Sequence, residues 1–323
     1  LRGMARSPGH SVVAVLTLGL GIGVVGTAFT ILNATVLRGL PFEEADRLVH
    51  FERARPADGV LSLAVTPHDY LAWAEEQSSF EGLGAYVEAS ALLPSEGAPP
   101  ERYLGVRISA NSFPLLRVTP SLGRGFTEDD ERLGAPDVVV LSHTLWQNRF
   151  GGAPDIVGRE IRLNDAPTTV IGVMPEGFGF PIAERFWLPL RLDLETTQRG
   201  QGRLDVFGRL ADGVAFEAAV AEFVRICEGL GEVYPDTNLG IVASMRSFHD
   251  EYVGEEFTRT AVRMLLGALL VLLVCCANVA NLLLIRGTRK QRSLALRVSL
   301  GATRGRIVRE LLTEAVVLTS VGA

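Results

Sequence analysis

One run of glycines has the spacing of a nucleotide-binding motif. Gly21, Gly23 and Gly26 match G-x-G-x-x-G, and Glu43 follows about twenty residues later, as in dinucleotide-binding folds. There the glycines let the backbone approach a pyrophosphate at the start of a helix with a polar outer face. Nothing in residues 27–37 is charged, however. The favoured interpretation is therefore a membrane-spanning helix.

Small and polar residues in two apolar stretches indicate helix packing. Gly19, Gly23 and Thr27 lie four residues apart, on one helical face that a neighbouring helix can approach closely. Asn278 and Asn281 lie three apart, and amides in hydrocarbon form interhelical hydrogen bonds that contribute roughly 0.6–2 kcal/mol each. A polar lining for a permeation route is the alternative interpretation of the two asparagines.

The sequence contains little evidence for a phosphate-binding or cation-binding motif. The only lysine is Lys290, and Gln291 follows it, so no P-loop is present and the chain is not itself a P-loop ATPase. The acidic run 128–131 lacks the alternating ligands and central glycine of a calcium loop, which favours a solvated turn.

The cysteines and histidines do not predict a metal centre or a disulfide framework. Cys275 and Cys276 are adjacent, Cys227 is distant from both, and we interpret all three as packing residues. The five histidines are scattered, with no CxxC or HExxH spacing. No nucleophile elbow or paired-carboxylate site stands out either, so the sequence predicts neither an enzyme nor a cofactor.

Two uncharged stretches divide the 323 residues. Residues 11–37 would form a helix about 40 Å long and residues 264–285 one of about 33 Å, against roughly 30 Å of bilayer hydrocarbon. A cleaved signal peptide has a shorter apolar region, so we expect the first stretch to be a retained anchor. The predicted fold class is a membrane protein with α-helical spans and an inserted mixed α+β domain.

Charge is segregated around these spans. Residues 1–37 carry 2 basic and no acidic side chains, residues 38–263 carry 21 and 35, and residues 264–323 carry 8 and 2. The positive-inside rule then places both ends in the cytoplasm and residues 38–263 outside it. The predicted organisation is a cytoplasmic N-terminus at 1–10, span 11–37, an exported domain at 38–263, span 264–285, a basic cytoplasmic segment at 286–309 and the start of a third span at 310–323.

Local signals predict elements within the exported domain. Thr66 is expected to cap a helix that Pro67 begins, and residues 91–100 read as a loop because they are rich in Pro, Gly and Ala. The other expected elements are a strand at 47–52, a strand at 137–141 followed by a helix at 143–150, a hairpin of 161–163 and 168–173 turning at Asn164-Asp165, and a helix at 216–230 ended by Gly229, Gly231 and Pro235.

Ordered motifs give the chain a specific resemblance. These are the Arg6-Ser7-Pro8-Gly9 entry to the first stretch, Gly123-Arg124-Gly125-Phe126, Asp155 to Arg159, Val170 to Pro175, Tyr234 to Asn238, and Cys276 to Leu284. The chain resembles the FtsX-like permeases of ABC transporters, with a MacB-like periplasmic core domain, and is similar to the duplicated acidobacterial permeases of this group. The similarity covers nearly the whole chain.

The resemblance implies a multi-pass protein of the bacterial inner membrane that works with a cytoplasmic ATPase subunit. It implies that residues 290–302 face this ATPase, with Lys290, Arg292, Arg297, Gly301 and Ala302 as the coupling residues. Ser293 stands where the family commonly has glutamate. A homodimer or duplicated second half and a periplasmic partner protein also fit the family, whereas nucleic acid does not.

Three functions are compared. The first is a permease that relays ATP-driven motion to a periplasmic domain, with export or efflux as the process that the resemblance implies. The second is a membrane-anchored sensor or receptor. The apolar residues after Glu310 favour the first, because a sensor would continue as a charged amphipathic helix. An exported enzyme is the third. The start at Leu1 and the apolar pattern that runs up to Ala323 suggest a fragment of a longer chain.

Overall fold

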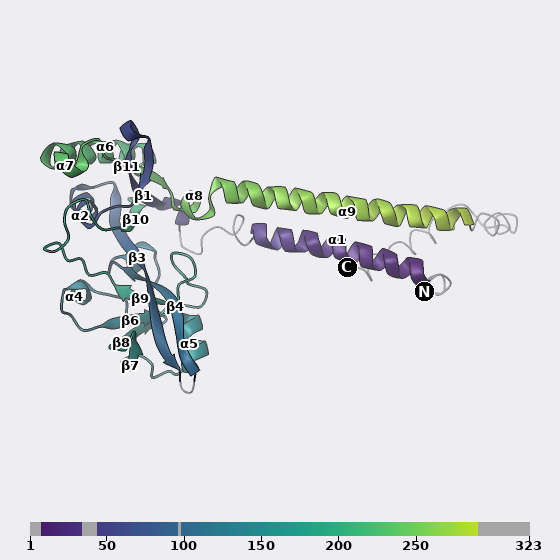
Figure 1. The fold of residues 1–323 in the computed structure, drawn as a ribbon, viewed down its shortest axis with the longest axis horizontal. Helices are drawn as coiled ribbons and strands as arrows, with labels where there is room; N and C mark the ends of the chain where they lie inside the picture. Colours follow the sequence, from purple (N-terminus) through teal and green to yellow (C-terminus); the bar gives the residue numbers. More distant parts are fainter. Residues whose placement is uncertain (1–7, 34–43, 96–97, 290–323) are drawn as a thin grey trace. The chain divides into compact units, whose positions relative to one another are not determined.

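The computed structural model describes residues 8–33, 44–95 and 98–289 (Figure 1). Its contacts divide the chain into two compact units. One is the globular segment Leu40–Tyr252, and the other contains helices α1 (Pro8–Leu32) and α9 (Glu255–Arg289).

The globular unit is built on one mixed sheet whose described strands follow the order β11-β1-β10-β3-β4-β9-β6-β8-β5, with β2 paired to β1 and β7 paired to β8. Most neighbours are antiparallel, while β4 with β9 and β6 with β8 are parallel. The strands are β1 (Leu48–Arg55), β2 (Val60–Leu63), β3 (Phe80–Ser95), β4 (Ala98–Ile108), β5 (Leu122–Gly123), β6 (Val138–Leu141), β7 (Glu160–Leu163), β8 (Ala166–Val173), β9 (Phe186–Pro189), β10 (Asp205–Leu210) and β11 (Val242–Ser247).

The long pair β3 and β4 corrects the prediction of a loop at 91–100. Residues 91–95 complete β3 and residues 98–100 begin β4, so most of this segment belongs to two paired strands of the sheet (Figure 1). The register shifts between Leu93 and Ser95, and this irregularity lets Pro94 fit without a ladder hydrogen bond. Cross-strand pairing has therefore overridden a composition typical of loops.

The helices of the globular unit cover the sheet. They are α2 (Pro67–Glu76), α3 (Ser112–Leu115), α4 (Glu128–Glu131), α5 (His143–Phe150), α6 (Phe216–Val233), α7 (Pro235–Asn238) and α8 (Phe248–Val253). The predicted cap of α2 is confirmed, since the Thr66 hydroxyl accepts from the Asp69 N–H. The predicted elements at 47–52, 137–141, 143–150 and the hairpin are confirmed too.

Two local predictions need correction. Gly229 and Gly231 do not end α6, which continues to Val233 because its apolar face packs on the sheet while Gly231 lies close to Asn238. The acidic run is not simply a solvated turn. It forms α4, in which the buried Asp130 pairs with Arg124 and caps the helix.

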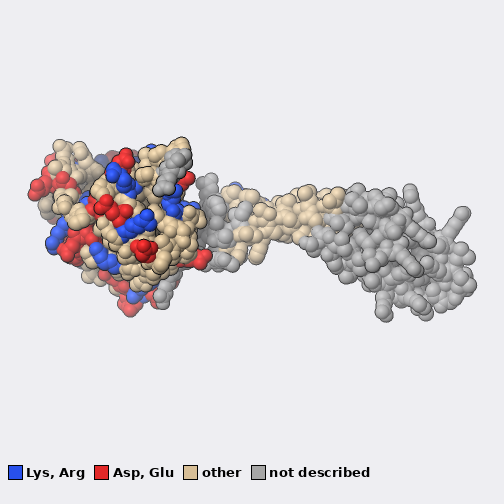
Figure 2. Space-filling view, turned by 90° about the horizontal axis from the view of Figure 1, so that it is seen from below, with Lys and Arg blue, Asp and Glu red and all other residues tan. Residues whose placement is uncertain are grey.

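Three buried clusters stabilise the globular unit. One lies under α2 and α6 and includes Trp73 and Phe223, a second is centred on Phe113 and Trp187, and the third lies between β6, β8 and α5. The visible face of this unit mixes acidic and basic side chains (Figure 2).

The helical unit is apolar. The stretch Thr258–Asn281 of α9 is long and apolar enough to cross a membrane, and Leu16–Thr30 of α1 is a shorter apolar stretch within the described residues. Large apolar side chains of α9 are exposed, among them Leu270 at 65% and Leu273 at 65%. Such exposure is typical of a lipid-facing helix.

Candidate functional site

The two long helices pack through a seam of small and apolar residues. On α1 the buried positions include Leu18, Gly21, Ala28 and Leu32, and on α9 they are Ala261, Ala268, Cys275 and Val279. These positions recur at intervals of three, four or seven residues, the spacing of an antiparallel coiled-coil seam. Because several of them are small, the two backbones approach closely.

At Gly21 the side chains of α9 pack closely against α1. A Cβ atom at Gly21 would lie 3.1 Å from Cδ1 of Leu272 and 3.3 Å from Sγ of Cys275. Gly23 and Gly26 have open space instead. Since α1 is one continuous helix through all three glycines, the dinucleotide-binding interpretation of this motif is wrong: it requires a strand and a turn before the helix.

The packing residues named from the sequence lie elsewhere. Gly23 and Thr27 are exposed, Gly19 is half-buried, and Asn278 and Asn281 are exposed on α9. None of the four exposed residues belongs to the seam between α1 and α9. Their role in packing stays a prediction, and it now concerns a helix other than these two. The seam itself was missed, although the heptad spacing of alanine and cysteine in α9 signals it.

The threonines of α1 show how an apolar helix accommodates hydroxyl groups. Thr27 Oγ1 donates to the Gly23 carbonyl at 2.9 Å, and Thr30 Oγ1 donates to the Gly26 carbonyl at 2.8 Å. Both hydroxyls are therefore satisfied within their own helix.

A buried carboxylate fixes the architecture at one end of the globular unit. Asp69, only 1% exposed, accepts from Arg53 Nη1, Thr66 Oγ1 and Asn238 Nδ2, each at 2.8 Å. Arg199 Nη1 lies 3.7 Å from the same carboxylate, and its guanidinium stacks on the Tyr234 ring. Asp69 thereby joins α2 to β1 and to the segment after α6.

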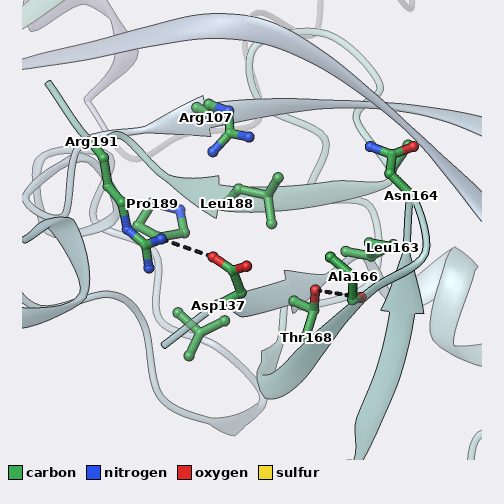
Figure 3. Close-up of a pocket in the computed structure, with 11 residues that line it drawn as sticks. Arg107, Asp137, Leu163, Asn164, Ala166, Thr168, Leu188, Pro189 and Arg191 are labelled. Atoms are coloured by element: carbon green, nitrogen blue, oxygen red, sulfur yellow. Dashed lines mark hydrogen bonds and ion pairs between the residues drawn. The ribbon is translucent and has the colours of Figure 1, made fainter. Parts of the chain in front are cut away.

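The other half of the globular unit contains a pocket of about 230 Å³ that is lined by apolar and polar side chains (Figure 3). Arg191 lies at its rim, held by Asp137 Oδ1 at 2.8 Å and by the carbonyl groups of Pro136 at 2.7 Å and Asp130 at 3.1 Å. Arg107 of β4 is exposed and faces the pocket without a hydrogen bond or ion pair to any described residue. The remaining lining residues are Ala91, Val138, Leu163, Asn164, Ala166, Thr168, Leu188 and Pro189.

This pocket can bind a ligand through the charged and hydrogen-bonding side chains of its lining. Its polar groups are guanidinium, carboxylate, amide and hydroxyl groups, and Thr168 Oγ1 donates to a backbone carbonyl at 3.3 Å.

The one cysteine of the globular unit, Cys227, is buried under α6, and burial raises the pKa of its thiol to about 11. Cys227 therefore packs as a protonated thiol at neutral pH.

Comparison with known proteins now adds to this geometry. The family model described as the MacB-like periplasmic core domain matches residues 11–226, about two thirds of the chain. This chain belongs to the MacB/FtsX-like ABC transporter permease family. The predicted resemblance is confirmed.

Relatives of this MacB-like chain include macrolide export ATP-binding/permease proteins MacB. That of Campylobacter jejuni (serotype O:2) is 23% identical over 260 residues, covering 79% of this chain and 38% of the relative. That of Escherichia coli K12 is 28% identical over 225 residues, covering 67% and 33%. The chain thus spans between a third and two fifths of the length of these curated relatives.

Two solved structures match parts of this chain at low sequence identity. The periplasmic region of MacB from Actinobacillus actinomycetemcomitans matches with a TM-score of 0.47 and 16% identity, covering 66% of this chain and 94% of that one. A domain of a permease protein from Porphyromonas gingivalis matches with a TM-score of 0.49 and 17% identity, covering 64% and 92%.

The predicted coupling residues of this MacB-like chain lie outside the described residues. They are Lys290, Arg292, Arg297, Gly301 and Ala302, which follow the described end of α9 at Arg289. Their contact with an ATPase stays a prediction.

Proposed function

We propose that this MacB-like chain is a mechanical relay, a permease part of an ABC transporter that couples ATP hydrolysis on a cytoplasmic partner to motion of its periplasmic domain. It performs no chemistry of its own in this role. The observation that supports the proposal is the unbroken helix α9, Glu255–Arg289. Its 35 residues extend over about 52 Å, longer than the roughly 30 Å of bilayer hydrocarbon, so one rigid rod would reach beyond the membrane.

The seam with α1 supports the same role. Ala261, Ala268 and Cys275 recur at heptad spacing and pack α9 against α1 along successive turns. Because of this packing, the two helices would move together when α9 is displaced. In this proposal α1 and α9 are the first and second inner-membrane spans of a multi-pass protein, residues 38–263 lie in the periplasm, and residues 286–309 dock on the ATPase. The process served is export or efflux.

Association tests this proposal. The full-length protein, purified from membranes in mild detergent, should bring an ATPase subunit with it or carry an ATPase domain in its own chain. Arg297→Glu should weaken that association, because it reverses a charge in the proposed coupling segment. Arg102→Glu is the matched control, since Arg102 is an exposed arginine of the globular unit. The proposal fails if neither an ATPase partner nor an ATPase domain is found.

A membrane-anchored sensor is the second candidate, and the pocket favours it. A receptor needs a ligand site in its exported domain, and Arg107 faces the pocket with no described partner. A sensor would not hydrolyse ATP or bind an ATPase. An ATPase-free complex that nonetheless changes conformation with a periplasmic ligand would favour this second function.

A further inference from the structure

Three potential metal ligands from distant parts of the sequence converge on one face of the sheet. His50 and Glu52 lie two residues apart on β1 and therefore point to the same face. Glu251 comes from α8, whose Phe248 packs against the His50 ring with centroids 6.4 Å apart. The ligand atoms of His50, Glu52 and Glu251 all lie within 4.8 Å of one another.

We propose that His50, Glu52 and Glu251 form a binding site for a divalent transition-metal ion of the Zn²⁺ type. One imidazole and two carboxylates are the donor set that such ions accept, with a fourth position left for water. Donor atoms on a common zinc ion stand about 3–3.5 Å apart at bond lengths of about 2.0–2.2 Å, so small side-chain rotations would close the site.

The surroundings of these ligands favour a cation. Asp205 also interacts electrostatically with His50 and Glu251, so a third carboxylate adds negative potential to the cluster beside the guanidinium group of Arg246. His50 is only 4% exposed, and imidazole binds a metal ion in its neutral form.

Arg246 is the cation that holds the two carboxylates together in this structure. It lies opposite His50 in the β1–β11 register, pairs with Glu52 and lies 3.4 Å from Glu251. Its side chain is 46% exposed, so it can turn into solvent at little cost when a metal ion takes its place. Arg246 and the metal ion thus compete for the same two carboxylates.

The consequence concerns the last helix before α9. A bound ion would join α8 to β1, in the same globular unit, by coordination bonds instead of ion pairs with Arg246. This would hold α8 on the sheet in proportion to the metal concentration.

Metal titration of the full-length protein in detergent tests the proposal. Calorimetry measures the binding of Zn²⁺. Co²⁺ is the second probe, because its visible spectrum reports nitrogen and oxygen ligation. We expect each chain to bind one ion at these three residues. Glu251→Gln should weaken Zn²⁺ affinity at least about tenfold. Glu217→Gln, which alters an exposed glutamate of α6, should leave the affinity unchanged.

A variant with the opposite expected effect makes the test specific. Arg246→Gln removes the competing cation and should tighten Zn²⁺ binding, whereas it would weaken binding if Arg246 only supported the local fold. Melting of each variant in excess chelator shows that it is folded. Equal affinities of the parent and Glu251→Gln chains, or weaker binding by folded Arg246→Gln, would overturn the proposal.

Discussion

Gly21 of α1 faces Cys275 of α9 so closely that a Cβ atom at Gly21 would lie 3.5 Å from the Cys275 Cβ and 3.3 Å from its Sγ. The first separation is within the range that joins two cysteines in a disulfide. The relationship identifies which faces of the two helices meet, and it is independent of the resemblance to known permeases.

A disulfide between α1 and α9 is the first prediction. Gly21→Cys should cross-link to the native Cys275 when the purified protein is oxidised, because the Cβ atoms are already at bonding separation. The measurement is the loss of two maleimide-reactive thiols per chain on oxidation. Gly23→Cys is the matched control, since no described atom outside the neighbouring backbone of its own helix lies within 4 Å of its Cβ position.

The variant Gly21→Cys with Cys275→Ser checks the partner. It should lose the cross-link even though Cys276 is present next door, because Cys276 is exposed and belongs to another face of α9. A Gly23→Cys chain that cross-links as readily as Gly21→Cys would contradict the seam.

The second prediction concerns the buried ion pair of the globular unit. Asp69→Asn should lower the free energy of unfolding by about 3 kcal/mol, because Arg53 is left buried without a counter-charge. The measurement is denaturant unfolding of the full chain, followed by tryptophan fluorescence. Asp58→Asn removes the solvated pair with Arg55 and should cost less than about 1 kcal/mol. Equal losses from both changes would show that Asp69 does not hold α2 to β1.

The sequence predicted those elements whose deciding residues lie close together along the chain. The cap of α2 at Thr66 and the helix α5 were predicted because their signals lie within a few residues. The strands around Pro94 were missed because their pairing depends on a partner strand and a shift of register. The carboxylate cluster of Glu52 and Glu251 was missed for a similar reason, since these residues are about 200 positions apart and only the folded sheet unites them.

Acid sensitivity of the α4 region is the third prediction. The Arg124 guanidinium, 2.6 Å away, lowers the pKa of Asp130, and hydrogen bonds from Thr127 act in the same direction. A carboxyl whose folded pKa is lowered stabilises the fold above its unfolded pKa, about 3.9, and this contribution disappears as pH falls through the folded pKa. Between pH 5 and pH 2 the parent should therefore lose more stability than Asp130→Asn.

Unfolding free energies across that pH range provide the measurement. At pH 7 Asp130→Asn should be the less stable of the two chains, and the difference should shrink towards pH 2. Asp129→Asn, at a residue paired in solvent with Arg132, should change stability at pH 7 by less than about 1 kcal/mol. A difference between parent and Asp130→Asn that stays constant with pH would refute the role given to Arg124.

The fourth prediction tests how the β7–β8 hairpin is tied to β3. Asn164 adopts a φ of 50°, and its side-chain Oδ1 accepts from the Leu92 N–H at 2.9 Å while its own N–H donates to the Leu92 carbonyl at 3.0 Å. Asn164→Ala should cost about 1–3 kcal/mol, because alanine disfavours positive φ and leaves the Leu92 N–H without its acceptor. Asp165→Gly, at a φ of 63°, should instead be neutral or stabilising by up to about 1 kcal/mol, since glycine adopts this conformation freely.

Thermal and denaturant unfolding measure the stability of both variants. Hydrogen exchange at Leu92 separates the two causes, because faster exchange in Asn164→Ala alone indicates the lost hydrogen bond. If the two variants were destabilised alike with unchanged exchange at Leu92, the hairpin would not depend on Asn164 for its attachment to β3.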